Sequence, residues 1–76
     1  MHTIYSLGQF IKQRRKQMKI TQESFAQKAG VGLRFLRELE SGKETARMDK
    51  VNEVLKMFGH TLGAVPMDRD ELLNNE

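Results

Sequence analysis

Two short helical patterns lie in the stretch TQESFAQKAGVGLRFLRELESGK, residues 21–43, where Gly30 separates them and Gly42 ends the second. Thr21 is a good N-cap for the first pattern, because its hydroxyl can accept a hydrogen bond from a free backbone N–H group of the first turn. Glycine suits the left-handed backbone position that often follows a helix. The stretch therefore predicts two short helices connected by a tight turn.

The second helical pattern, from about Gly32 to Ser41, has two distinct faces. At about 100° per residue, one arc is apolar and carries Phe35, Leu36 and Leu39. The opposite arc carries a leucine beside charged and polar residues, namely Leu33, Arg34, Arg37, Glu38 and Ser41. We expect the apolar arc to pack in the core and the opposite arc to face a partner.

Two further helices and one strand are predicted around this pair. Ser6 and Gln9 have the spacing of a capping box, and an apolar stripe follows them at Leu7, Phe10, Ile11 and Met18. A fourth helix from about Asp49 to Gly59 places apolar residues at i, i+3, i+4 and i+7, which are Val51, Val54, Leu55 and Phe58. HTLGAV, residues 60–65, has the mixed apolar and β-branched composition of a brief strand, bounded by Pro66.

The length and the distribution of charge indicate one small basic domain with an acidic tail. A chain of 76 residues buries only about 60% of its unfolded surface, so its stability is marginal and a dimer would relieve this. Residues 1–60 carry twelve Lys or Arg and six acids, whereas residues 61–76 carry one arginine and four acids. We expect a domain over residues 1–65 with a polyanionic partner, followed by a disordered acidic tail over residues 66–76.

Several classes of protein do not fit this composition. The chain has no cysteine, so neither a disulfide framework nor a thiolate zinc site can hold the fold. His2 and His60 are far apart in sequence, and we assign no metal and no cofactor. No Gly-rich phosphate loop or nucleophile elbow is present, so we do not expect an enzyme. The N-terminus lacks a signal-peptide pattern and no run is apolar enough for a membrane span, which favours a cytoplasmic protein.

Two short helices joined by a tight turn, with a basic helix before them, form a helix-turn-helix arrangement, in which the second helix lies in the DNA major groove. Base contacts are then expected from Leu33, Arg34, Arg37 and Glu38. Arginine can donate twice to guanine, glutamate can accept from cytosine, and leucine can pack on a thymine methyl group. Alternatively, Arg34 and Arg37 are ordinary solvated helix charges paired with Glu38, and Leu33 contacts a neighbouring protein surface.

Contacts with the DNA backbone are expected on both sides of the second helix. Gln22 is the first residue of its helix, where free N–H groups and the positive helix end favour a phosphate oxygen. Lys43, Thr45 and Arg47 lie in the loop after the recognition helix. Such contacts fix the register on the duplex without reading sequence.

The segment TQESFAQKAGVGLRFLRELESGK resembles the helix-turn-helix of the Cro and phage-repressor (Xre) family, and the similarity covers about residues 7–59. The resemblance implies the same base contacts, and phosphate contacts at Gln22 and Lys43. It also implies an ion pair between Arg15 and Glu40. Angular spacing is compatible with that pair, which we expect to be structural.

Residues 33–63 resemble, in order, the recognition helix, loop and fourth helix of HipB-type antitoxins. That resemblance implies a homodimer that represses its own operon, binds a HipA-type kinase toxin and dimerises in part through a strand after the fourth helix. In this chain, Thr61, Leu62, Ala64 and Val65 stand at that place.

The fold expected from the sequence is thus an all-α domain of four helices with a short C-terminal strand for dimer pairing. One recognition helix reads few bases, so we expect a homodimer on a palindromic operator. Two alternatives remain: a module whose main role is to bind a kinase-like toxin, and a plain phage-type repressor without a toxin. The interpretation as an RNA-binding domain has less support. Such a domain exposes aromatic residues for base stacking, whereas Tyr5 and the four phenylalanines lie mostly on inner stripes.

Overall fold

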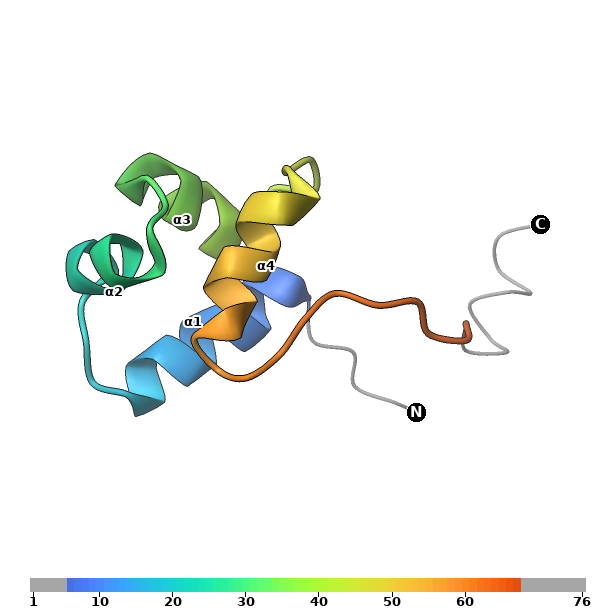
Figure 1. The fold of residues 1–76 in the computed structure, drawn as a ribbon, viewed down its shortest axis with the longest axis horizontal. Coiled ribbons are helices and arrows are strands. Elements are labelled where there is room, and N and C mark those ends of the chain that lie inside the picture. Colours follow the sequence, from blue (N-terminus) through green and yellow to red (C-terminus); the bar gives the residue numbers. More distant parts are fainter. Residues whose placement is uncertain (1–5, 68–76) are drawn as a thin grey trace.

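The computed structural model describes residues 6–67, which contain four α-helices and no strand. Their bounds are α1 Leu7–Gln17, α2 Gln22–Ala29, α3 Leu33–Glu40 and α4 Met48–Lys56. Helix α3 packs against α1 and α2, and α2 also contacts α4 (Figure 1). The prediction of an all-α domain with four helices is confirmed. None of these four helices is long and apolar enough to cross a lipid bilayer.

Side-chain caps and glycines in a left-handed conformation mark several of the helix ends. Ser6 forms the expected capping box, since its hydroxyl accepts from the Gln9 N–H at 3.2 Å and the Gln9 side chain accepts from the Ser6 N–H at 3.2 Å. The Thr21 hydroxyl accepts from the Ser24 N–H at 3.1 Å. Gly30 and Gly42 have φ angles of +76° and +100°, a region in which other residues are strained. These local interactions fix the start of α1, both ends of α2 and the end of α3.

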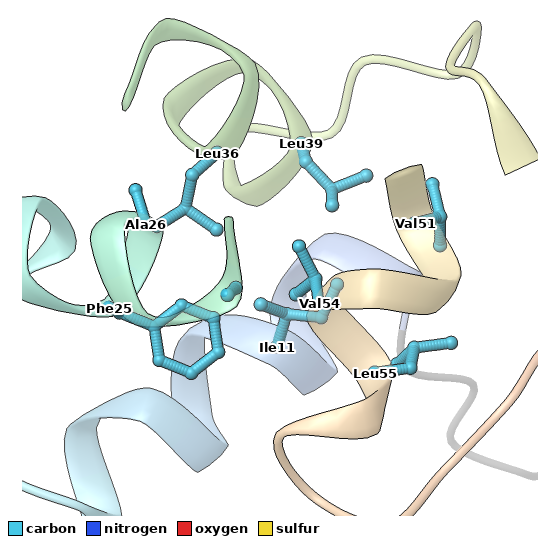
Figure 2. Packing of buried hydrophobic residues seen from close by; sticks show 9 residues of the cluster. Ile11, Phe25, Ala26, Leu36, Leu39, Val51, Val54 and Leu55 are labelled. Atoms are coloured by element: carbon cyan, nitrogen blue, oxygen red, sulfur yellow. The ribbon is translucent and has the colours of Figure 1, made fainter. Parts of the chain in front are cut away.

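The hydrophobic core is formed by all four helices. Side chains from each helix point toward one another in Figure 2, and Phe25, Ile11, Leu36 and Val54 are the largest of those that are fully buried. The complete buried set is Ile11, Phe25, Ala26, Ala29, Leu36, Leu39, Val51, Val54 and Leu55. The apolar arc of α3 predicted from the sequence is therefore the side that faces the core, although Phe35 is only partly buried.

A close approach between α1 and α3 depends on Gly8. A Cβ atom at this position would collide with the backbone carbonyl oxygen of Leu39 and would lie 3.1 Å from the carbonyl oxygen of Glu40. Because both obstacles are backbone atoms, a flexible side chain cannot move aside to make room. The absence of a side chain at Gly8 lets α1 lie directly against the end of α3.

The strand expected at residues 60–65 is absent from the described chain. Leu62 donates its backbone N–H to the Asn52 side-chain oxygen at 2.8 Å, and the Thr61 hydroxyl donates to the same oxygen at 3.1 Å. Leu62 also packs against the core, whereas Ala64 and Val65 are exposed. A strand needs a second strand to pair with, and here the Asn52 side-chain oxygen of α4 accepts from the segment instead. Most of the acidic tail, residues 68–76, lies outside the described residues.

Candidate nucleic-acid interface

A buried ion pair fixes the position of α3. The Arg15 guanidinium donates to both oxygens of the Glu40 carboxylate, at 2.8 and 3.0 Å, and to the backbone carbonyl of Ile20 at 2.9 Å. Arg15 is 8% exposed and Glu40 is 7% exposed. The hydrogen bond to Glu40 raises the pKa of Arg15 above its usual value. The structure thus places the two residues of the expected pair in contact, where they connect α1 and α3.

Gln22 also belongs to this network. Its side-chain amide donates to Glu40 Oε1 at 3.0 Å, so α2 is connected to the same carboxylate. The sequence predicts Gln22 as a phosphate contact, and one of the two N–H groups of its amide is engaged within the protein. A phosphate oxygen at this end of α2 would also meet free backbone N–H groups of the first turn.

The four residues predicted to contact bases occupy the side of α3 that faces away from the core. The Arg34 side chain is 92% exposed, the Arg37 side chain 57% and the Glu38 side chain 38%. Leu33 is half-buried, so it is less exposed than a residue that faces only solvent. One flank of α3 is therefore held by apolar packing, and two arginines extend from the other.

The charges on this face are paired within the chain. Glu38 accepts from Arg34 at 3.4 Å and from Lys43 at 3.2 Å. Arg37 lies 3.8 Å from a carboxylate oxygen of Glu23, which belongs to α2. The hydrogen bond from Lys43 holds the pKa of Glu38 below its ordinary value. This surface therefore carries fixed negative as well as positive charge.

The loop between α3 and α4 carries the other residues predicted to hold phosphates. Lys43, Thr45 and Arg47 are exposed, and with four neighbours they line a hollow of about 370 Å³, the others being Phe35, Glu38, Leu39 and Ala46. Arg47 forms a two-pronged pair with Asp49, at 3.1 and 2.7 Å. The structure thus brings all three residues to the C-terminal end of α3, next to Glu38.

Some of these contacts were not predicted from the sequence. The amide of Gln22 on Glu40 joins residues 18 positions apart, and the pair of Arg37 with Glu23 joins α3 to α2. Helical periodicity carries no information about such pairs, because it applies within one helix only. The pair of Arg34 with Glu38 belongs to the alternative interpretation of this face, since a spacing of four places both residues on one helix face.

The sequence model of the helix-turn-helix family matches residues 11–63 of this chain. The matched segment includes α2, the turn at Gly30 and α3, together with most of α1 and all of α4. The chain belongs to the helix-turn-helix family. The resemblance to Xre-type proteins inferred from residues 21–43 is confirmed at this level. Closeness to HipB-type antitoxins is a finer statement and remains a prediction.

One relative is a protein of Sinorhizobium fredii (strain NBRC 101917 / NGR234) that is named "Uncharacterized HTH-type transcriptional regulator y4mF". It is 43% identical over 53 residues, which cover 70% of this chain and 70% of the relative. No solved structure matches the chain. The family membership therefore comes from the sequence comparisons, and the position of each side chain comes from the structure.

Proposed function

We propose that this helix-turn-helix protein is a sequence-specific DNA-binding repressor. The observation that carries the proposal is α3 itself: Leu36 and Leu39 anchor it in the core, while the Arg34 side chain extends outward with 92% exposure. A helix held in this way can enter the major groove with its outward side chains at the base edges. Residues 1–60, with twelve basic and six acidic side chains, supply the positive charge that a DNA partner requires.

In this proposal, Arg34 and Arg37 donate to guanine, Glu38 accepts from cytosine, and Leu33 packs on a thymine methyl group. Lys43, Thr45, Arg47 and the N-terminus of α2 at Gln22 hold the phosphate backbone on either side. The support is that Lys43, Thr45 and Arg47 are exposed and line one hollow with Glu38 at the end of α3. Occupying a promoter in this way would repress transcription.

We also propose that a homodimer is the working unit, on a palindromic operator with half-sites about 34 Å apart or a multiple of this distance. One short helix contacts too few bases for useful selectivity. The C-terminal segment supports the proposal, because Val65 is 81% exposed and Met67 53% exposed, which leaves apolar surface for a second copy. Pairing of Thr61, Leu62, Ala64 and Val65 with the same residues of a second copy across a two-fold axis is part of this proposal.

The experiment that tests the proposal is selection of bound duplexes from a random pool at fixed salt concentration. We expect an inverted repeat among the selected sites. Arg34→Ala should then cost about 1 to 3 kcal/mol on the selected site and relax the preference at one base pair. Lys43→Ala should weaken binding to all sequences and make the salt dependence shallower by about one phosphate contact.

Lys56→Ala provides the matched control, because it removes one positive charge from α4 at a residue paired with Glu53 rather than from the α3 face. A selection without any enriched sequence would contradict specific binding. Equal losses on every sequence for Arg34→Ala would contradict its role as a base reader.

A second role, as an antitoxin that autoregulates its operon and binds a HipA-type kinase toxin, is supported by the resemblance of residues 33–63 to HipB-type proteins. The test is co-expression with the product of the adjacent reading frame, followed by purification through a tag on this chain. A stoichiometric complex with a kinase-like protein supports the antitoxin role. An adjacent frame of phage or metabolic type favours a plain repressor instead.

A further inference from the structure

Glu38 has an unusual position on the candidate DNA-reading face. Each of its two carboxylate oxygens holds a different cation: Oε2 accepts from Arg34 at 3.4 Å and Oε1 accepts from Lys43 at 3.2 Å. In the proposed complex, Arg34 is a base reader and Lys43 is a phosphate contact. One carboxylate in the free protein therefore engages one residue from each class of DNA contact.

The pair with Lys43 is built into the end of α3. Five positions separate Glu38 and Lys43, so helical spacing alone does not bring them together. The left-handed turn at Gly42, with φ +100°, closes the helix so that the Lys43 N–H donates to the Glu38 carbonyl at 3.1 Å. The Ser41 hydroxyl donates to the same carbonyl at 2.8 Å. These two bonds to the Glu38 carbonyl thus hold Lys43 within reach of the Glu38 carboxylate in the free protein.

We propose that Glu38 is a specificity-determining residue that occupies Arg34 and Lys43 as an internal anion and thereby weakens binding to non-cognate DNA. The inference rests on the proposed DNA-binding function and deepens it. The carboxylate takes the place that a phosphate or a guanine edge would take on these two side chains. DNA that takes Arg34 and Lys43 as contacts must therefore displace Glu38 from them.

Displacement has different consequences on the two kinds of DNA. On a cognate site, Arg34 moves to guanine, Lys43 moves to a phosphate, and the freed carboxylate can accept from a cytosine amino group. On non-cognate DNA no such donor is in place, so an unpaired carboxylate is left close to the negatively charged duplex. Glu38 then either remains on Lys43, with the loss of one phosphate contact, or remains unpaired. Both outcomes disfavour non-cognate binding.

The test compares Glu38→Gln with Glu53→Gln. Both variants remove one negative charge from a helical glutamate that pairs with a lysine, but Glu53 lies on α4 and pairs with Lys56 at 3.5 Å. The affinity of each variant is measured for a random-sequence duplex and for a duplex selected by the wild-type protein, over a series of salt concentrations. Thermal unfolding of each variant, followed by circular dichroism, verifies that it is folded.

We expect Glu38→Gln to bind the random duplex about two- to fivefold more tightly than Glu53→Gln does, which is the effect of freeing an exposed ion pair. Its salt slope on random DNA should steepen by about 0.9, corresponding to one more phosphate contact. Binding to the selected duplex should not improve, so that the ratio of cognate to random affinity falls. In a Lys43→Gln background, the gain on random DNA from Glu38→Gln should shrink.

Equal random-DNA affinities and salt slopes for the two glutamine variants would overturn the role of Glu38 as an internal anion. So would a gain of the same size in the Lys43→Gln background. Failure of the folded wild-type protein to bind any duplex at low salt would instead refute the proposed function, and this inference with it. A lower unfolding temperature of Glu38→Gln with unchanged DNA preference would show that Glu38 only stabilises the helix.

Discussion

Replacing Arg15 by methionine removes the cation of the buried ion pair and keeps much of the side-chain volume. Arg15 donates twice to Glu40 and once to the carbonyl of Ile20, and both charged residues are more than nine-tenths buried. Among the described residues, only the amide of Gln22 would remain bonded to the Glu40 carboxylate. Removing one partner of a buried pair costs about 3 to 5 kcal/mol, because the other charge is left uncompensated.

That cost is large for a chain of 76 residues. At about 0.05 to 0.15 kcal/mol per residue, the free energy of unfolding of such a domain is about 4 to 11 kcal/mol. Arg15→Met should therefore remove about a quarter or more of the stability, or unfold the protein at room temperature. The measurement is urea unfolding followed by far-UV circular dichroism, with the free energy of unfolding extrapolated to water.

The double variant Arg15→Met with Glu40→Leu separates the charge from the packing. It removes both members of the pair, so no charge is left buried, and most of the lost stability should return. A loss below about 1 kcal/mol for Arg15→Met, the range of an exposed pair, would refute the reasoning. A double variant as unstable as the single one would show that packing, and not the unpaired carboxylate, determines the cost.

Three other changes test the fold. Gly8→Ala should lower the free energy of unfolding by about 1 to 3 kcal/mol despite the better helix propensity of alanine, because the new methyl group collides with the Leu39 carbonyl. The measurement is the urea midpoint, and Gly63→Ala is the control, because a Cβ atom there has no atom within 4 Å. Leu36→Ala should cost about 2 to 5 kcal/mol in urea unfolding, because Leu36 is fully buried, and a smaller loss would contradict the packing of α3. The side-chain hydrogen bond from Arg47 lowers the pKa of Asp49, so Asp49 stabilises the fold above its unfolded pKa of about 3.9 and this contribution is lost at lower pH. Asp49→Asn should therefore show a smaller fall in the urea midpoint between neutral pH and about pH 3, whereas an equal fall would contradict the effect.

The helices could be predicted from the sequence because their determinants are local. The hydroxyl of Ser6 acts on an N–H three residues away, and a glycine such as Gly42 needs only its own backbone to take a left-handed conformation. The apolar side of α3 follows from the period of the helix. Met18 shows the limit of this reasoning: it shares the stripe of Ile11, but it lies just past the last turn of α1 and is 42% exposed.

Contacts between distant residues could not be predicted in the same way. The mixed apolar composition of residues 60–65 predicts a strand, but composition does not specify a pairing partner. In the structure the Asn52 side chain, ten residues before Leu62, accepts the N–H group that a strand partner would need. The outward direction of Arg34 was correctly inferred, whereas its ion pair with Glu38 was considered only as one alternative.

The buried polar network also connects the fold to the candidate interface. Arg15 of α1 and Gln22 of α2 both donate to the carboxylate of Glu40 at the end of α3. Apolar side chains alone tolerate small shifts of one helix on another, whereas the directed hydrogen bond from Gln22 to this carboxylate, which Arg15 also holds in place, restricts the angle between α2 and α3. In the proposed complex, α2 contacts phosphates and α3 contacts bases, so that angle sets the distance between the two kinds of contact. A buried pair that adds little to stability over an apolar substitute would thus still determine how the recognition helix meets DNA.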